Sequence, residues 1–415
     1  MEYGLIGARL GHSFSPEIHK KIADYHYELC ELTPDGVAEL MRGRSFRAIN
    51  VTIPYKETVI PMLDEISPEA RRIGAVNTVV NRGGRLYGYN TDYSGAAALI
   101  RHAGVTPGGK KVLLLGTGGT SKTLHAVLSD MGASEIVTVS RTAGEGRVTY
   151  AEALARHTDA GVIVNTTPVG MFPHGDECPI DIGAFPALCG VIDVIYNPLT
   201  TRLVAAARAR GIPAECGLYM LAAQAVYASA LFRDIAADGG IIDRVYREVL
   251  AEKRNIVLIG MPSCGKSSVG KRTAGLLGKK FIDTDALVEE TAGRSIPEIF
   301  ASEGEAAFRA LERSAVAAAA AESGAVIATG GGAVLDPVNV AALRQNGITV
   351  FLDRPLSMLA GTADRPLARD AAALARGFEE RYPIYTAVAD ITVPGAGSVD
   401  EVAAAVAEKT GEYRL

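Results

Sequence analysis

The sequence predicts an α/β protein with largely parallel sheets and more than one domain. Runs of apolar residues that suit buried strands alternate with helical stretches along nearly the whole chain. The chain has 415 residues, more than one ordinary domain needs. Two glycine-rich segments, residues 116–121 and 260–267, each directly follow an apolar run. Each is typical of a buried strand that turns through glycines into a helix.

The bulk composition is that of a core-forming globular protein. Apolar residues make up 48% of the chain and charged residues 21%, and the net charge of −5 disfavours binding to nucleic acid. No apolar run reaches the roughly 18 residues of a membrane span. The first residues lack a basic leader segment and are expected to form a strand. The five cysteines are scattered without metal-ligand spacing, so we expect a cytoplasmic protein with neither a disulfide framework nor structural zinc.

The pattern of runs and breakers predicts three domains. The first covers residues 1–105, with strands near 3–6, 47–53 and 78–80 and helices near 16–25 and 93–102. A segment rich in glycine at 103–109 leads into the second domain, 106–217. Its expected order is strand 111–115, helix 123–131, and strands 136–139, 162–165 and 191–195. Helices at about 218–253 complete the first domain, and the third domain, 254–415, contains an alanine-rich helix at 311–321.

The first glycine loop predicts a Rossmann-like domain that binds a dinucleotide. Backbone N–H groups and a helix N-terminus suit a pyrophosphate, and the loop lacks the lysine that a triphosphate would need. The residues expected at the cofactor are Gly116, Gly118, Gly119, Thr120 and Ser121. Arg141 follows the next strand, where it can pair with a 2′-phosphate, so NADP(H) is favoured over NAD. The other interpretation of Arg141 is a solvated surface charge.

Polar residues before this loop could reduce a ketone. Lys56 follows one expected strand and Asp92 another, with Asn77 between them, and Ser13 and Ser15 lie on one side of an extended segment. Reduction requires a proton or a positive field at the ketone oxygen as hydride arrives, and Lys56 with Asp92 could supply it. Taken singly, each of these residues could equally be a helix cap, a turn former or a surface charge.

The second glycine loop is a complete Walker A motif. Its backbone, which includes Gly260 and Gly265, would cradle phosphates, while Lys266 reaches the β- and γ-oxygens and Ser267 binds Mg²⁺. We therefore predict ATP and Mg²⁺ in this domain. Asp283 and Asp285 lie at a strand end, where one can serve the magnesium shell while the other accepts a proton from a substrate hydroxyl.

Together these segments resemble two known families, one after the other. Residues 1 to about 245 resemble shikimate dehydrogenase in the segments 13–16, 50–57, 74–78, 88–92, 165–171, 193–198 and 217–224. Residues from about 254 to 415 resemble shikimate kinase in the Walker A loop, in 281–285 and in the arginine and glycine segments that follow. The resemblance implies a substrate-binding α/β domain, a Rossmann-like NADP domain and a P-loop kinase domain with a lid.

For the first family, the resemblance implies reduction of 3-dehydroshikimate to shikimate with NADPH. Lys56 and Asp92 would be the catalytic pair, and Ile195 and Gly217 would flank the nicotinamide. The residues implied to bind substrate are Ser13, Ser15, Thr52, Asn77, Tyr196 and Gln224. Residues 140–147 are shorter than the family's pattern, in which a second basic residue follows soon after the arginine.

For the second family, the resemblance implies transfer of phosphate from ATP to shikimate. Asp285 would act at the acceptor hydroxyl, and Asp283 would join Ser267 at magnesium. Ser268 would contact the nucleotide, and Arg365 would lie in a lid over ATP, between residues 360 and 377. The residues implied to bind shikimate are Asp285, Arg309, Gly331, Gly332 and Arg381. The loop departs from the family's glycine-rich version at Ser263 and Cys264.

The sequence thus predicts a bifunctional enzyme of the shikimate pathway, in which the product of the first reaction is the acceptor of the second. Its partners would be small molecules, with neither nucleic acid nor membrane, and the oligomeric state is not predicted. One alternative is an NAD-dependent quinate/shikimate dehydrogenase fused to the kinase. Another is a regulator that senses metabolites without catalysis. The presence of Lys56, Asp92, Lys266, Ser267 and Asp283 argues against the regulator.

Overall fold

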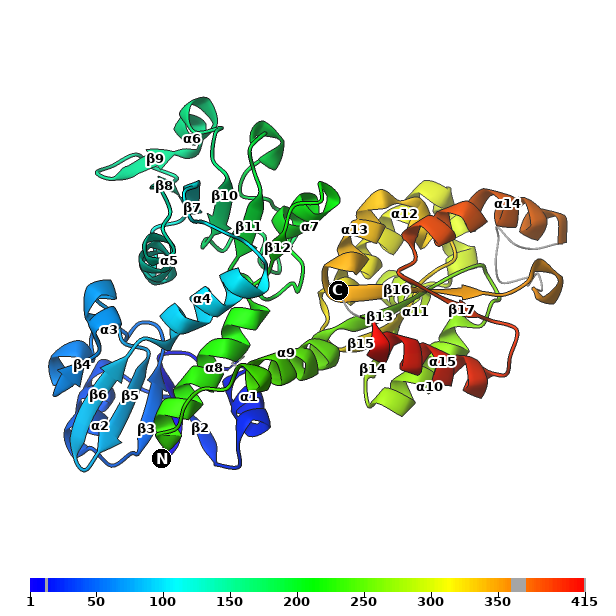
Figure 1. Cartoon of the computed structure of the whole chain (residues 1–415). Coiled ribbons are helices and arrows are strands. Elements are labelled where there is room, and N and C mark those ends of the chain that lie inside the picture. The colour runs from blue at the N-terminus through cyan, green and yellow to red at the C-terminus, as the bar shows by residue number, and fades with distance from the viewer. Residues whose placement is uncertain (12–13, 360–370, 414–415) are drawn as a thin grey trace. The chain divides into compact units, whose positions relative to one another are not determined.

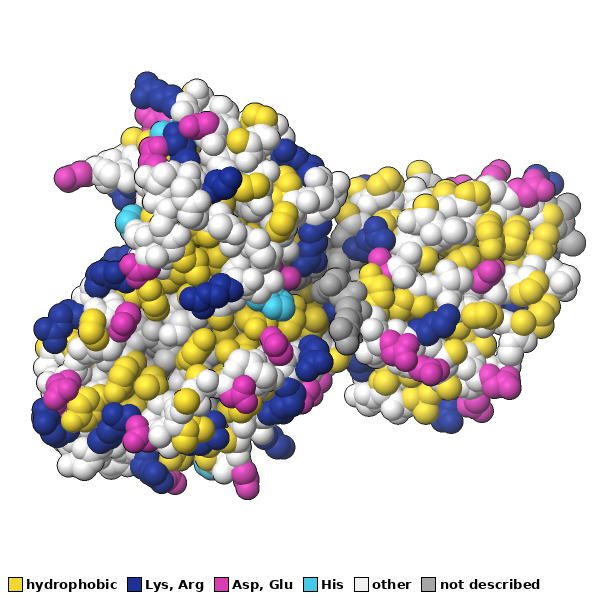
Figure 2. All heavy atoms as spheres, in the orientation of Figure 1, with side chains coloured by type: hydrophobic (Ala, Val, Ile, Leu, Met, Phe, Trp, Pro, Cys, Tyr) yellow, Lys and Arg dark blue, Asp and Glu magenta, His cyan; other side chains and the backbone are white. Residues whose placement is uncertain are grey.

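The computed structural model of the chain describes residues 1–11, 14–359 and 371–413 (Figure 1). They form two compact units, Met1–Val249 and Leu250–Leu415. Strands and helices alternate in both, so the predicted α/β class is confirmed. In the described part of the chain, no helix is long and apolar enough to cross a membrane. Acidic and basic side chains are interspersed over the face of the N-terminal unit shown in Figure 2.

The first sheet of the N-terminal unit is mixed and not parallel throughout. Its order is β2-β1-β3-β5-β6-β4. The strands are β1 (Tyr3–Gly7), β2 (Tyr27–Glu31), β3 (Ala48–Val51), β4 (Glu65–Ile66), β5 (Thr78–Arg82) and β6 (Arg85–Tyr89). β3 and β5 are antiparallel, as are β5 and β6, which the glycine pair 83–84 joins with positive φ at both residues. The sequence did not predict β2, β4 and β6, because their alternating or short apolar patterns are those of half-exposed strands.

Helices from two distant parts of the sequence cover this sheet. They are α1 (Ser15–Ile22), α2 (Pro34–Gly43), α3 (Pro68–Ile73), α4 (Thr91–His102) and α8 (Leu218–Arg233), while Tyr246 of α9 (Gly239–Lys253) packs on His102 and Tyr219. α4 and α8 pack side by side (Figure 1). A Cβ on Gly95 would lie 2.9 Å from the backbone oxygen of Met220, so only glycine permits this close approach. α8 also contributes Ala228 and Phe232 to the cluster of buried side chains around Tyr3.

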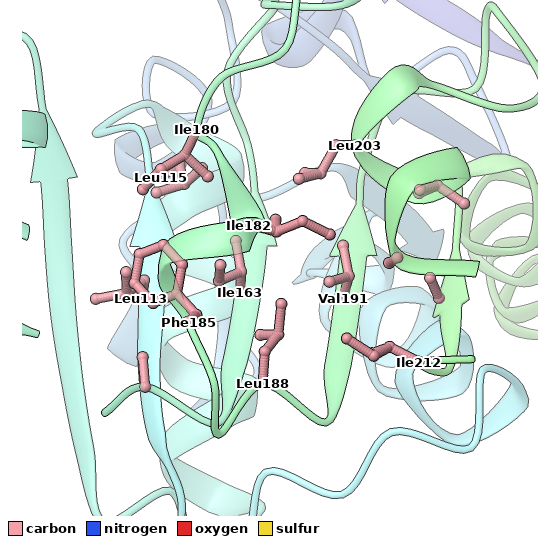
Figure 3. Close-up of a cluster of buried hydrophobic side chains, with 14 of the residues drawn as sticks. Leu113, Leu115, Ile163, Ile180, Ile182, Phe185, Leu188, Val191, Leu203 and Ile212 are labelled. Carbon is pink, nitrogen blue, oxygen red and sulfur yellow. The ribbon is translucent and has the colours of Figure 1, made fainter. Parts of the chain in front are cut away.

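The second sheet is parallel throughout, in the order β12-β11-β10-β7-β8-β9. The strands are β7 (Lys111–Leu115), β8 (Glu135–Ser140), β9 (Arg147–Thr149), β10 (Val162–Asn165), β11 (Gly190–Asp193) and β12 (Ala214–Glu215). Its helices are α5 (Gly119–Asp130), α6 (Tyr150–Arg156) and α7 (Arg202–Ala209). Figure 3 shows Leu113, Ile163 and Val191 from adjacent strands facing Phe185 and Leu188. These strands are nearly continuous apolar runs because both faces of the sheet are covered.

The third sheet, in the C-terminal unit, is parallel in the order β14-β15-β13-β16-β17. The strands are β13 (Asn255–Ile259), β14 (Lys280–Asp283), β15 (Ala325–Ala328), β16 (Gly347–Asp353) and β17 (Ile391–Pro394). Alternate residues of β13 face opposite clusters: Ile256 and Leu258 pack with one set of helices, Val257 and Ile259 with the other.

Helices cover both faces of the third sheet. α10 (Lys266–Leu277) and α15 (Val399–Glu412) lie on one face, and α12 (Ile296–Ala321), α13 (Pro337–Asn346) and α14 (Ala371–Val388) on the other, while α11 (Thr284–Ala292) packs on α12 (Figure 1). Short 3-10 helices occur at Ile60–Met62, Ile182–Ala184, Ala333–Leu335 and Leu356–Met358. The predicted helix 311–321 is the end of α12, which non-helical dihedrals at Gly304 interrupt. Residues 360–370 of the predicted lid lie outside the described residues.

Asp193 is a buried carboxyl group at the end of β11. It accepts hydrogen bonds from Asn165 Nδ2 (3.1 Å), the backbone nitrogen of Ile195 (3.1 Å) and Thr201 Oγ1 (2.8 Å). Burial nevertheless raises the pKa of Asp193 from 3.8 to about 6. The folded state therefore retains the proton over a range of pH in which the unfolded chain has lost it.

We predict that Asp193 makes the folded state less stable as the pH rises from about 4 to about 6. Because the pKa is higher in the folded state, the stabilisation present below pH 4 is lost through this window, by about 3 kcal/mol. Asp193→Asn keeps the acceptor and cannot ionise. The difference in free energy of unfolding between wild type and Asp193→Asn, from urea titrations at several pH values, should shift in favour of the variant as pH rises. A difference that is independent of pH would contradict this account.

Candidate active sites

A cavity of about 490 Å³ lies in the N-terminal unit where its two sheets face one another. It gathers nine of the residues predicted for the dehydrogenase site: Ser15, Thr52, Lys56, Asn77, Asp92, Thr120, Tyr196, Gly217 and Gln224. Ser13 lies outside the described residues. The sequence placed these residues along more than 200 positions, and only the return of α8 to the first sheet brings Gln224 beside Lys56.

Lys56 and Asp92 form an ion pair in this cavity. Lys56 Nζ lies 2.6 Å from Asp92 Oδ2, and the two side chains are 28% and 19% exposed. Lys56 is in the turn that follows β3, and its backbone oxygen accepts a hydrogen bond from Val76. Asp92 is in the first turn of α4, which Asn90 caps. The predicted pair is therefore held from two separate backbone segments, with both head groups accessible from the cavity.

A buried polar network positions Asn77 at the cavity wall. Asn77 Oδ1 accepts a hydrogen bond from the backbone nitrogen of Thr91 at 2.7 Å, which fixes Asn77 against the start of α4. Asn50 Nδ2 donates to the backbone oxygen of Asn77 (3.2 Å), and Tyr27 donates to Asn50 Oδ1 (2.7 Å). Asn50 was not predicted as a positioning residue, although it lies on β3 only two residues before the predicted Thr52.

Arg9 also lines the cavity and was not predicted. The charged residues among the lining residues are Arg9, Lys56 and Asp92. Because Lys56 and Asp92 offset each other, Arg9 gives the lining a net positive charge. Such a cavity suits an anionic substrate.

The first glycine loop fits a dinucleotide phosphate. Gly116 has φ of +109°, and a Cβ there would lie 2.6 Å from Thr166 Oγ1, so the loop packs tightly on the segment after β10. Ser121 Oγ donates to the Gly116 oxygen at 2.7 Å. A Cβ on Gly118 or Gly119 would meet nothing within 4 Å, which leaves open space at the N-terminus of α5.

Three further residues predicted at the cofactor, Arg141, Ile195 and Gly217, lie at strand ends of the second sheet. Gly217 directly precedes α8 and lies close to Val194. A Cβ on Gly217 would overlap the backbone oxygen of Val194. The backbone nitrogen of Gly217 donates a hydrogen bond to the backbone oxygen of Ile195, a buried residue. Arg141 is exposed directly after β8, at the edge where a ribose phosphate would lie.

The Walker A loop connects β13 to α10. Gly260, Ser263 and Gly265 have positive φ. Lys266 is buried, and its Nζ donates to the backbone oxygens of Gly260 (2.8 Å) and Met261 (2.9 Å). The ammonium group therefore lies within the loop that would hold the phosphates. Ser268 follows in the first turn of α10.

Ser267 and Asp283 come together as the predicted magnesium site requires. Ser267 Oγ donates to Asp283 Oδ2 at 2.6 Å, and Asp283 caps α11 by accepting from the backbone nitrogen of Asp285. No group of three or more His, Cys, Asp or Glu residues suited to a metal occurs where the structure is described. Mg²⁺ would therefore take its other ligands from phosphate oxygens and water, as it commonly does.

Three consecutive glycines after β15 allow the residues predicted to bind shikimate to lie close to the backbone of this segment. A Cβ on Gly330 would lie 2.6 Å from Asp285 Oδ1 and 2.9 Å from Glu312 Oε1, and one on Gly332 would overlap the Arg309 guanidinium. A Cβ on Gly331 would lie 2.8 Å from Pro262 of the Walker A loop. The predicted residues Asp285, Arg309, Gly331 and Gly332 thus lie beside the loop.

Two arginines at this site differ in their partners. Arg309 binds Glu312 (2.7 Å) and Glu305 (3.0 Å). Arg381 is buried and its Nε has no hydrogen-bond partner, an arrangement that suits an anionic ligand. Arg365 lies outside the described residues. Glu312, which the sequence analysis missed, could have been found from its i, i+3 spacing to Arg309 on a helix.

Comparison with known proteins identifies both halves. Residues 5–79 match the family model of the shikimate dehydrogenase substrate binding domain, and residues 262–410 match that of shikimate kinase. The NADP⁺ shikimate dehydrogenase of Clostridium perfringens (strain SM101) is 36% identical over 265 residues, covering 60% of this chain and 97% of that protein. The chain belongs to the shikimate dehydrogenase family. Its C-terminal unit carries a shikimate kinase domain, so the predicted fusion is confirmed.

Solved structures agree with the assignment of the dehydrogenase part. The shikimate 5-dehydrogenase of Thermus thermophilus, in complex with NADP(H) and shikimate, has a TM-score of 0.53 and 30% identity over 60% of this chain and 99% of that one. The quinate dehydrogenase of Corynebacterium glutamicum, in complex with NAD, has a TM-score of 0.55 and 27% identity over 60% of this chain and 99% of that one.

Arg309 should stabilise the C-terminal unit of this dehydrogenase–kinase chain. Glu312 is 1% exposed, and burial raises the pKa of Glu312 while Arg309 opposes that rise. Arg309→Ala leaves the carboxyl group buried without its cation and should lower the free energy of unfolding by about 3 kcal/mol. The matched double variant Arg309→Ala/Glu312→Gln should recover most of that loss in urea titrations. A single variant as stable as wild type would contradict the assignment.

Proposed function

We propose that the N-terminal unit reduces 3-dehydroshikimate to shikimate with NADPH, and that the C-terminal unit phosphorylates the shikimate 3-hydroxyl with ATP and Mg²⁺. The observation that carries the proposal is the 2.6 Å Lys56–Asp92 pair. The pair lies in a cavity that polar side chains help to line, among them Thr120 from the first glycine loop. The two family matches place the second reaction in the same chain as the first.

In the dehydrogenase, NADPH supplies the hydride when bound. Negative charge then develops on the ketone oxygen, and the Lys56 ammonium donates a hydrogen bond and a proton to it. Asp92 orients the Lys56 ammonium group through the ion pair. Serine, threonine, glutamine and tyrosine side chains of the lining would bind the hydroxyls, while the positive charge of Arg9 suits the substrate carboxylate.

In the kinase, ATP with Mg²⁺ supplies the phosphoryl group when bound. Lys266 would leave its backbone acceptors for phosphate oxygens, and Ser267 with Asp283 would hold the metal ion. Asp285 lies beside the glycines after β15 and would accept the proton of the attacking hydroxyl. Arg309 and Arg381 would grip the shikimate carboxylate in the bidentate way that guanidinium groups allow.

Arg141 supports NADP(H) as the cofactor because its exposed side chain can pair with a 2′-phosphate. The similarity to a quinate dehydrogenase that binds NAD favours one alternative, oxidation of quinate or shikimate with NAD. Turnover with each pair of cofactor and substrate would separate the two. We also propose a cytoplasmic location, since all five cysteines are free thiols.

Lys56→Met should abolish most dehydrogenase activity. Loss of the proton donor should lower kcat for NADPH oxidation by about 100-fold or more, while NADPH binding, measured by fluorescence, stays unchanged. Phosphorylation of added shikimate by the same variant should continue at the wild-type rate, because the two sets of residues are separate. Loss of both activities would overturn the assignment of independent sites.

Lys266→Ala is the converse variant. It should lower the rate of ATP-dependent shikimate phosphorylation by about 100-fold or more, since the cation at the phosphates is gone. Reduction of 3-dehydroshikimate should proceed at the wild-type rate, followed as loss of NADPH absorbance. A kinase rate equal to that of wild type would refute the role given to the Walker A loop.

A further inference from the structure

Arg354, at the edge of the kinase site, has one buried guanidinium nitrogen that lacks a hydrogen-bond partner. The side chain is half-buried, and its Nε is buried with no hydrogen-bond partner. A buried donor that lacks an acceptor is costly and is rare in folded proteins. The neighbouring acid, Asp353, instead accepts a hydrogen bond from Tyr382 at 3.1 Å. The fold therefore holds a buried N–H donor whose acceptor is not part of the described structure.

The backbone around Arg354 places this charge against the Walker A loop. Arg354 directly follows β16, which pairs with β13, the strand that leads into the loop. A Cβ on Gly260 would lie 3.0 Å from the backbone oxygen of Leu352, so the loop and the end of β16 are in contact. At the other end of the loop, a Cβ on Gly265 would lie 3.9 Å from Arg354 Nη1. The guanidinium is therefore beside the residue that precedes Lys266.

A second contact fixes the stem of Arg354. The backbone nitrogen of Gly395, which follows β17, donates to the oxygen of Asp353 at 2.7 Å. A Cβ on Gly395 would lie 3.2 Å from Arg354 Cβ, so the turn after β17 packs directly on the arginine. Arg354 thus lies at the carboxyl ends of three adjacent strands, where parallel α/β sheets bind their ligands.

We propose that Arg354 binds the phosphate chain of the nucleotide beside the Walker A loop. This inference rests on the proposed kinase function. A guanidinium group offers two parallel N–H donors that match the oxygens of a phosphate. Lys266 donates to loop oxygens and must exchange them for phosphate, whereas no hydrogen bond or ion pair in the described structure holds the Arg354 head group. Arg354 therefore adds a second positive charge, besides that of Lys266, beside the Walker A loop. This loop carries Ser263 and Cys264 where the family has glycines.

Binding of ADP with Mg²⁺ to the full chain tests this inference by calorimetry. Arg354→Met keeps the apolar stem and removes the charge, and it should raise the Kd of MgADP about tenfold. Arg272→Met is the matched control, because Arg272 is exposed on α10 and paired with Asp400 at 2.6 Å. The control should bind MgADP like wild type, and Arg354→Met should bind shikimate like wild type.

The thermal stability of the variant separates ligand binding from a structural role. Because Arg354 buries a donor without an acceptor, Arg354→Met without nucleotide should melt at the wild-type temperature or above it, and MgADP should raise its melting temperature less than it raises that of wild type. Equal MgADP affinity in wild type and Arg354→Met would overturn the inference and leave the kinase proposal intact. If Arg354→Met raised the Kd of adenosine and that of ADP by the same factor, the proposed contact with phosphate would be wrong. Failure of wild type to bind MgADP would overturn the kinase proposal and this inference with it.

Discussion

The loops that carry the chemistry leave their sheets at the carboxyl ends of parallel strands, and this constraint organises both units. In a parallel sheet all strands run the same way, so the segments that follow them meet at one edge. The glycine loop after β7 and the segment after β11 meet there in the second sheet. The Walker A loop, Asp283, the three glycines after β15 and Arg354 meet there in the third. Residues far apart in sequence therefore become neighbours.

Glycine residues allow these segments to pack closely against one another. The glycines after β15 permit Asp285, Arg309 and Glu312 to approach the backbone, and Gly95 and Gly217 permit α8 to pack against α4 and the end of β11. α8 is the element that returns from the second sheet to the first and brings Gln224 to the cavity. A side chain at any of these positions would displace a neighbouring backbone or side-chain group.

The cationic residues of the two sites differ in whether the protein itself supplies a partner for them. Lys56 and Arg309 are paired with acids, which keeps each cation oriented. The buried Nε atoms of Arg354 and Arg381 have no hydrogen-bond partner. These Nε donors are ones that an anionic ligand would satisfy, whereas Lys56 and Arg309 are cations whose orientation the protein fixes.

The sequence predicted the α/β class, the two families and the cofactors because those depend on local patterns. Each glycine loop, with its preceding strand and following helix, is a contiguous signal. The mixed first sheet was not predicted, because β2 and β6 are half-exposed strands whose residues alternate in polarity and whose direction depends on distant partners. Glu312, Asn50 and Arg354 were missed for a related reason. Their roles arise from burial and from neighbours that the chain brings together only on folding, and a lone arginine or asparagine in sequence carries no such signal.

Turnover of 3-dehydroshikimate by the purified full chain with NADPH, ATP and Mg²⁺ tests whether the two proposed reactions occur in series. We predict that one equivalent of shikimate 3-phosphate and one of ADP form for each NADPH oxidised, and that omission of ATP stops the reactions at shikimate. Oxidation of NADPH without any phosphorylated product, or consumption of ATP that does not depend on shikimate, would contradict this prediction.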